Sequence, residues 1–267
     1  GLEYAFWAYY FGVCAARGVD MRGLAHTFWR LTRILVQYDW IPIWLSSARW
    51  GRYLKAAGND SSKALALYEH NTELSNAIMH DIAHFEVAIR NVYDRSICKN
   101  FNGHEHWLFD ESSPVIKPLY RSRKGSVIDL NARNRFSIME AQRRARSKPV
   151  APGQVIAELP FGFWRHLTDS AHEKNLWVPY LHSVFPPGTD RKAIEQALAM
   201  INKVRNRASH HEPLFTQRRY RELSAAHGFI IELAQMFLPE LADHIHNTSR
   251  VADILSDFRS SNGLWPR

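Results

Sequence analysis

Residues 58–97, GNDSSKALALYEHNTELSNAIMHDIAHFEVAIRNVYDRSI, decide the fold class of this chain. The stretch opens with Gly-Asn-Asp-Ser-Ser, which is a start signal for a helix. Apolar side chains then recur mostly at intervals of three and four, as they do along one face of a helix. They are Leu65, Tyr68, Leu74, Ile78, Ile82, Phe85, Ile89 and Val92. This spacing predicts either two consecutive helices that break within residues 71–75, or one long bent helix.

Helical periodicity also dominates the rest of the chain from about Leu45 onward, and no segment alternates like a strand of convincing length. Residues 190–211 predict a strong helix, with Asp190 as its cap. One apolar stripe runs along it through Ile194, Ala197, Leu198, Ile201 and Val204. Residues 217–238 and 240–258 are also predicted to be helical, whereas 98–118 should be irregular. The predicted fold class is all-α.

The charge of the chain points to an anionic partner. The 267 residues carry a formal net charge of +8, and 46% of them are hydrophobic, which is enough for a core. Residues 121–148 hold nine Lys or Arg against two acidic residues, a local balance of +7. This segment is either a solvated surface loop or an RNA-binding element in which Tyr120 and Phe136 stack on bases. The expected RNA-binding side chains are those of Arg121, Arg123, Lys124, Arg133, Arg135, Arg143, Arg144 and Arg207.

The two cysteines, Cys14 and Cys98, are too far apart in sequence to suggest a disulfide framework, so a reducing cytoplasm is expected. The aromatic N-terminus lacks the positive region of a secretory signal, and charged residues interrupt the next apolar stretch. No stable membrane insertion is therefore expected. We divide the chain into an N-terminal extension of unknown role (1–43), one helical domain (44–260) and a tail (261–267).

The sequence VRNRASHHEPLF, residues 204–215, is the strongest candidate for a chemical site. Arginine can clamp a phosphate, and histidine exchanges protons near neutral pH. Arg205 and His210 lie five residues apart, which on an ideal helix makes them diverge by about 140° unless the helix is distorted. Pro213 gives a reason for an irregular turn here. The alternative is that these side chains only decorate the solvated end of a helix, where cations are favoured.

Arg205, Asn206, three further residues and then His210 resemble the R-x4-6-H motif of the HEPN superfamily. The continuation His-His-Glu-Pro is similar, more narrowly, to Abi-like proteins associated with bacterial abortive infection. Residues 44–91 resemble the N-terminal helical region of that group, and GQVIAELPFGFWRHL, residues 153–167, resembles its central segment. The resemblance covers residues 44–258.

The resemblance implies a HEPN-type helical bundle with additional helices, which commonly forms a homodimer in which two such motifs meet. It implies a metal-independent endoribonuclease that leaves a 2′,3′-cyclic phosphate, acts as a toxin in phage defence and needs no cofactor. Arg205 would hold the scissile phosphate, His210 would be the general base or acid, and Asn206 would orient one of them. RNA would be the substrate, and an inhibitory RNA or an antitoxin a possible partner. Glu212 departs from a HEPN toxin type that carries a tyrosine there.

Accessory roles are expected for His211, Glu86, Arg90 and Asn91. Glu86 and Arg90 form either an ordinary ion pair within one helix or part of a helix whose Glu86 or Asn91 braces the motif. No metal is expected, because neither His80 with His84 nor His104 with His106 has a third ligand at a recognised spacing. Trp107, Trp164 and Trp177 should be core. The rival function is a non-catalytic HEPN module that binds RNA or a partner protein.

Overall fold

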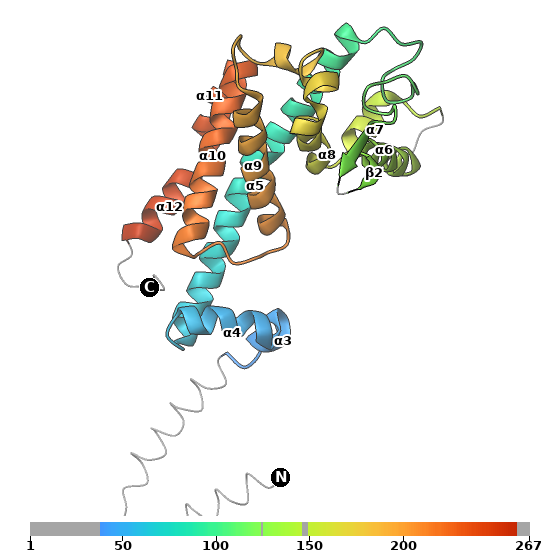
Figure 1. Cartoon of the computed structure of the whole chain (residues 1–267). Helices are drawn as coiled ribbons and strands as arrows, with labels where there is room; N and C mark the ends of the chain where they lie inside the picture. Colours follow the sequence, from blue (N-terminus) through green and yellow to red (C-terminus); the bar gives the residue numbers. More distant parts are fainter. Residues whose placement is uncertain (1–37, 124, 146–148, 261–267) are drawn as a thin grey trace, which may run out of the picture. The chain divides into compact units, whose positions relative to one another are not determined.

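The computed structural model describes residues 38–123, 125–145 and 149–260. The expectations for residues 1–37 therefore fall outside the described part of the chain. The described residues divide into two compact units, 38–68 and 69–260. The boundary falls within one helix, α5 (Ser61–Asn100), which belongs to both units (Figure 1).

The first unit contains α3 (Ile41–Leu45), α4 (Ser47–Ala56) and the first two turns of α5. Ser46, between α3 and α4, has a positive φ, and its hydroxyl accepts the Arg49 N–H at the start of α4. The ring of Tyr68 packs edge-on against those of Trp44 and Tyr53. These aromatic contacts hold the short helices together.

Helix α5 is continuous over 40 residues, so of the two alternatives the structure has the single long helix and not a break within residues 71–75. The polar residues there make tertiary contacts and do not end the helix. The buried Asn71 carboxamide accepts the Leu214 N–H, and the Ser75 hydroxyl donates to the Asn71 carbonyl at 2.7 Å. The predicted apolar face is confirmed from its third member onward, because Leu74, Ile78, Ile82, Phe85, Ile89 and Val92 are all buried.

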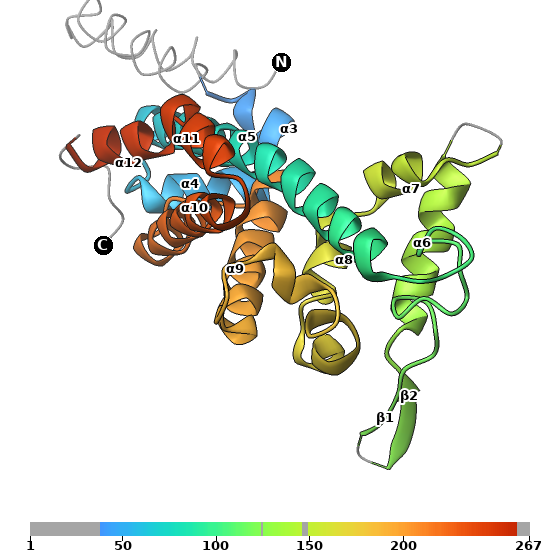
Figure 2. The same ribbon diagram turned by 90° about the horizontal axis from the view of Figure 1, so that it is seen from above.

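The second unit is built around α5, alongside which α9 (Arg191–Ser209), α10 (Gln217–Phe237) and α11 (Pro239–Thr248) run (Figures 1 and 2). The Asp190 carboxylate accepts the Lys192 N–H, which confirms the predicted cap of α9, and the predicted apolar stripe of this helix is buried. Residues 240–258, predicted as helical, are two helices, since Ser249 separates α11 from α12 (Val251–Ser260). The all-α class is confirmed.

A smaller layer follows α5 in sequence. It contains a hairpin of β1 (Tyr120–Arg123) and β2 (Ser126–Asp129), in which Tyr120 pairs with Asp129, and α6 (Ala132–Arg144). Helices α7 (Pro152–Glu158) and α8 (Phe161–His166) come next, then η1 (Ser170–His172), η2 (Glu173–Trp177) and η3 (Leu181–Val184). The hairpin adds two short strands to a chain in which the sequence showed no alternating strand of convincing length. Its strands are four residues long and β2 is largely exposed, so no alternating pattern marks them.

Candidate functional site

Helix α9 ends with a Schellman motif inside the candidate sequence. The His211 N–H donates to the Ala208 carbonyl at 3.0 Å, and the Glu212 N–H donates to the Arg207 carbonyl at 2.9 Å. His211 has φ 53°, in the left-handed region where glycine usually ends a helix. Pro213 follows two residues later and cannot continue the helix. The backbone thus turns at His210 and His211, at the end of the R-N-x-x-x-H sequence.

The guanidinium of Arg205 faces α5. Its Nε lies 4.0 Å from Glu86 Oε2 and has no hydrogen-bond partner among the described residues. Burial raises the pKa of Glu86, although the charges of Arg205 and Arg90 act in the opposite direction. The Arg205 side chain remains 32% exposed. Arg205 is therefore held loosely by one carboxylate, and part of its positive charge is open to a ligand.

Arg207 is bound far more tightly. Its Nη1 pairs with Glu222, and its Nε lies 3.7 Å from Glu212. Lys203 donates to Glu222 at 2.8 Å, and Arg219 pairs with Glu212 at 3.2 Å. Burial opposes ionisation of Glu222, but the hydrogen bonds from Lys203 and Arg207 outweigh it and lower the pKa of this carboxyl. Arg207 thus forms ion pairs with two carboxylates of its own chain, which the spacing of residues in the sequence did not predict.

His210, His211 and Asn206 are exposed at the end of α9. The Asn206 carbonyl accepts the His210 N–H at 3.1 Å and the Ser209 hydroxyl at 3.0 Å. Within the described residues, no hydrogen bond or ion pair joins Arg205 to His210. Arg205 instead contacts Glu86 on α5, and His210 is exposed at the end of α9.

Three of the expected accessory residues, Glu86, Arg90 and Asn91, lie on α5, and among the described contacts only Glu86 reaches the motif. Glu86 contacts Arg205, as one of the two sequence alternatives held. Arg90 donates instead to the Ala157 carbonyl at 3.5 Å, and no ion pair within 4.0 Å joins it to Glu86 in the described structure. Asn91 is exposed.

A family model described as Abi-like protein matches residues 36–216, about two thirds of the chain. The chain belongs to the Abi-like protein family. The match includes the whole Arg205–His211 motif, starts earlier than residue 44 and stops before α10. No curated protein and no solved structure matches the sequence. Among the described helices of this Abi-like protein, none is long and apolar enough to cross a membrane.

The basic segment of this Abi-like protein forms the hairpin and α6, and several of its arginines have protein partners. Arg135 pairs with Asp129, and Arg144 donates to Glu158 at 3.1 Å. Arg143 is 72% exposed although it pairs with Glu140, and Arg133 is exposed. Lys124 and the side chain of Arg123 lie outside the described structure. Tyr120 and Phe136 are 66% and 60% exposed, whereas Trp107, Trp164 and Trp177 are buried as predicted.

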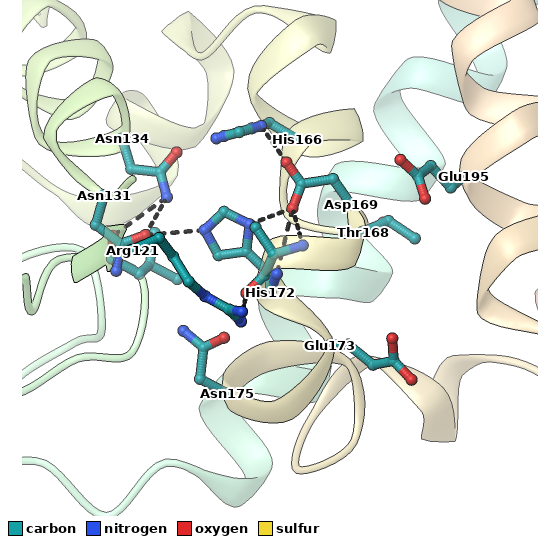
Figure 3. A network of polar contacts seen from close by, with 12 residues as sticks. Arg121, Asn131, Asn134, His166, Thr168, Asp169, His172, Glu173, Asn175 and Glu195 are labelled. Carbon is teal, nitrogen blue, oxygen red and sulfur yellow. Dashed lines mark hydrogen bonds and ion pairs between the residues drawn. The ribbon is translucent and has the colours of Figure 1, made fainter. Parts of the chain in front are cut away.

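A buried polar network joins this segment to the rest of the Abi-like chain (Figure 3). The Asn131 amide donates to the carbonyls of Pro114 and Lys117, so its oxygen faces His172 Nε2 at 2.9 Å as an acceptor. His172 Nδ1 lies 2.7 Å from Asp169. Both ring nitrogens of the buried His172 thus face side-chain oxygens. Arg121, an expected RNA-binding residue, donates to the Ala171 carbonyl at 3.3 Å.

Proposed function

We propose that this protein is a HEPN-type, metal-independent endoribonuclease that acts in abortive infection or a toxin-antitoxin system. The observation that carries the proposal is the contrast between the two motif arginines. Arg207 is neutralised by Glu222 and Glu212, whereas Arg205 is partly exposed and only loosely balanced by Glu86. A cation that contributes little to the fold but is positioned by a carboxylate is suited to a phosphate.

The reaction needs no group beyond arginine, histidine and the RNA itself. A base removes the proton of the ribose 2′-hydroxyl, and the 2′-oxygen then forms a bond to phosphorus. The bond from phosphorus to the 5′-oxygen breaks, and an acid protonates that leaving oxygen. The products are a 2′,3′-cyclic phosphate and a 5′-hydroxyl. Arg205 would stabilise the negative charge that develops on the phosphoryl oxygens.

A homodimer would supply the missing geometry. On an ideal helix Arg205 and His210 would diverge by about 140°, and His210 is exposed at the end of α9. A two-fold interface over the end of α9 would place the histidine of one chain near the arginine of the other. Each such site would contain the arginine of one chain and the histidine of the other, so a dimer would carry two sites.

The test is incubation of the purified protein with labelled RNA in excess EDTA. We expect the wild type to leave 2′,3′-cyclic phosphate ends, and Arg205→Ala and His210→Ala to lower the rate at least about a hundredfold. Two matched controls, Arg218→Ala on α10 and His246→Ala on α11, should cleave like the wild type, because both side chains are exposed outside the motif.

Cleavage by both motif variants at the wild-type rate would refute the assigned residues. Binding of RNA without cleavage by the wild type, over a range of RNAs, would favour the rival function of a non-catalytic binding module. Growth arrest on expression that either motif variant abolishes would support the toxin role.

A further inference from the structure

The C-terminal end of α5 and the irregular segment after it bring three different donor groups together. Asp94 and Cys98 lie one turn apart on α5, and His106 lies on the following segment. His106 Nε2 is 3.2 Å from Asp94 Oδ1 and 3.3 Å from Cys98 Sγ, and Cys98 Sγ is 3.6 Å from Asp94 Oδ1. The three donor atoms therefore form a nearly regular triangle.

The size of this triangle matches one face of a tetrahedral zinc site. Zinc bonds of about 2.3 Å to sulfur and about 2.0–2.2 Å to nitrogen and oxygen place the donor atoms roughly 3.3–3.6 Å apart. All three measured separations fall within about 0.1 Å of that range. The combination of thiolate, imidazole and carboxylate selects zinc over Mg²⁺ and Ca²⁺, which prefer oxygen ligands.

We propose that Asp94, Cys98 and His106 bind one Zn²⁺, with the fourth position left to water. Trp107 Nε1–H donates to Asp94 Oδ1 at 2.8 Å and orients the carboxylate, as outer groups do in zinc sites. Zinc would displace the Cys98 proton and require the His106 proton to move to Nδ1. The Leu108 N–H donates to His106 Nδ1 at 3.3 Å, and this contact would be lost when Nδ1 carries the proton.

A second cluster, His166, Asp169 and His172, also lies within reach of one ion but is already satisfied by hydrogen bonds. Both nitrogens of His172 are occupied, by Asp169 and Asn131, and Asp169 accepts four hydrogen bonds or ion-pair contacts from His166, Ala171 and His172. The hydrogen bonds within this second cluster therefore account for the short distances between its donor atoms. In the cluster of Asp94, Cys98 and His106, by contrast, the thiol of Cys98 is only a weak hydrogen-bond donor, whereas its thiolate would be a strong zinc ligand.

The zinc site would be separate from the motif. Asp94 follows Glu86 by eight residues, which is about 12 Å along the axis of α5. Bound zinc would tie the end of α5 to residues 104–107, where the chain leaves the helix. Zinc binding here is therefore compatible with metal-independent cleavage at Arg205 and His210. Experiments could refute either proposal and leave the other standing.

The experiment is a titration of the metal-free full chain with Co²⁺ and with Zn²⁺. We expect one equivalent of Co²⁺ to give the visible bands of a tetrahedral site and a thiolate charge-transfer band, and Zn²⁺ to abolish both. Cys98→Ser should remove the charge-transfer band, and His106→Ala should weaken binding at least about tenfold. Trp107→Phe should weaken binding by roughly tenfold, because the carboxylate of Asp94 then has no indole N–H to orient it.

Two controls match these variants. Cys14→Ser removes the other cysteine, and His104→Ala removes the other histidine of the His-Glu-His sequence, so both should bind the metal like the wild type. If a variant does not fold, alkylation of the wild type decides, because Zn²⁺ should slow the reaction of Cys98 at least about tenfold. An octahedral Co²⁺ spectrum, a thiolate band that depends on Cys14, or alkylation of Cys98 unaffected by Zn²⁺ would overturn the proposal.

Discussion

Arg205 and Arg207 lie two residues apart on α9, but their charges are balanced differently. The side chain of Arg207 is 15% exposed and contacts two carboxylates. That of Arg205 is about twice as exposed and contacts one, at 4.0 Å. The proposed function gives the chemical role to Arg205, because an arginine that already has close ion pairs, as Arg207 has, gains little from binding a phosphate.

Glu86→Gln tests whether this carboxylate positions Arg205. We expect kcat for RNA cleavage to fall roughly ten- to a hundredfold with little change in KM, since Arg205 loses its anchor. The melting temperature at pH 7 should not fall, because burial raises the pKa of Glu86 and its ionised form therefore costs stability. A lower melting temperature with unchanged kcat would instead assign Glu86 a purely structural role.

His211→Gly separates the two adjacent histidines. The left-handed conformation of His211 costs a residue with a Cβ about 1 kcal/mol, which glycine avoids. We expect the variant to be more stable in urea by up to about 1 kcal/mol and to keep wild-type cleavage. Loss of cleavage without loss of stability would show that His211, and not only His210, takes part in the reaction.

Asp169→Asn gives a pH-dependent effect. Burial would raise the pKa of Asp169, but hydrogen bonds from His166 and His172 outweigh it and hold this pKa well below its ordinary value of 3.8. The folded-state pKa is thus the lower one, so the carboxylate stabilises the fold above about pH 4, and this contribution is lost as the pH falls further. Melting curves should show a clear deficit for the variant at pH 7 that shrinks below pH 4. Asp243→Asn, on the exposed side of α11, should show no such deficit.

At the scale of elements, the hairpin and α6 lie within residues 121–148, whose local balance of +7 is most of the formal charge of +8. Arg133 and Arg143 are exposed cations of α6, and Tyr120 and Phe136 are also exposed in this part of the chain. If this layer binds RNA, the double variant Arg133→Ala with Arg143→Ala should flatten the dependence of log K on log salt by about 0.7 for each phosphate that it no longer neutralises. Filter binding at several salt concentrations measures this, and Arg218→Ala, which removes an exposed cation of α10, should leave the slope unchanged.

The sequence predicts regular helices well here and irregular elements poorly. Asp190 and the apolar stripe after it define α9, because the cap and the period agree. Asn71 and Ser75 look like a break, but their polar groups bond to Leu214 and to the helix backbone. Polar residues with tertiary partners cannot be distinguished from turn residues without those partners.

The candidate site was predictable only in part for the same reason. The motif sequence identifies Arg205 and His210, but the pairing of Arg207 with Glu222 joins residues 15 apart. His106 had no third ligand at a familiar spacing because Asp94 and Cys98 precede it on a helix, and the chain must turn back before the three meet. Such sets are defined by the path of the backbone and not by their spacing.

At the scale of the whole molecule, the proposed function depends on two copies of the chain. If the arginine and histidine of each site come from different chains, mixing Arg205→Ala with His210→Ala should restore cleavage. Half of the randomly assorted dimers would be mixed, and each would have one intact site of two, so about a quarter of the wild-type rate should return. If both residues of a site come from one chain, the mixture should stay inactive. Each variant alone, at the same total concentration, is the control.

Three carboxylates of helix α5 form hydrogen bonds or ion pairs with residues from later segments of the chain. Asp81 is met by His227 and Ser249, Glu86 by Arg205, and Asp94 by His106 and Trp107. One inserted residue turns everything after it by about 100° about the helix axis. An insertion between Asp81 and Glu86 would thus turn Glu86 and Asp94 by this angle relative to Asp81, so the three acids could no longer all face their partners, whereas a substitution removes one acid. Gain or loss of a single codon there should be far less tolerated in this family than any exchange of side chains.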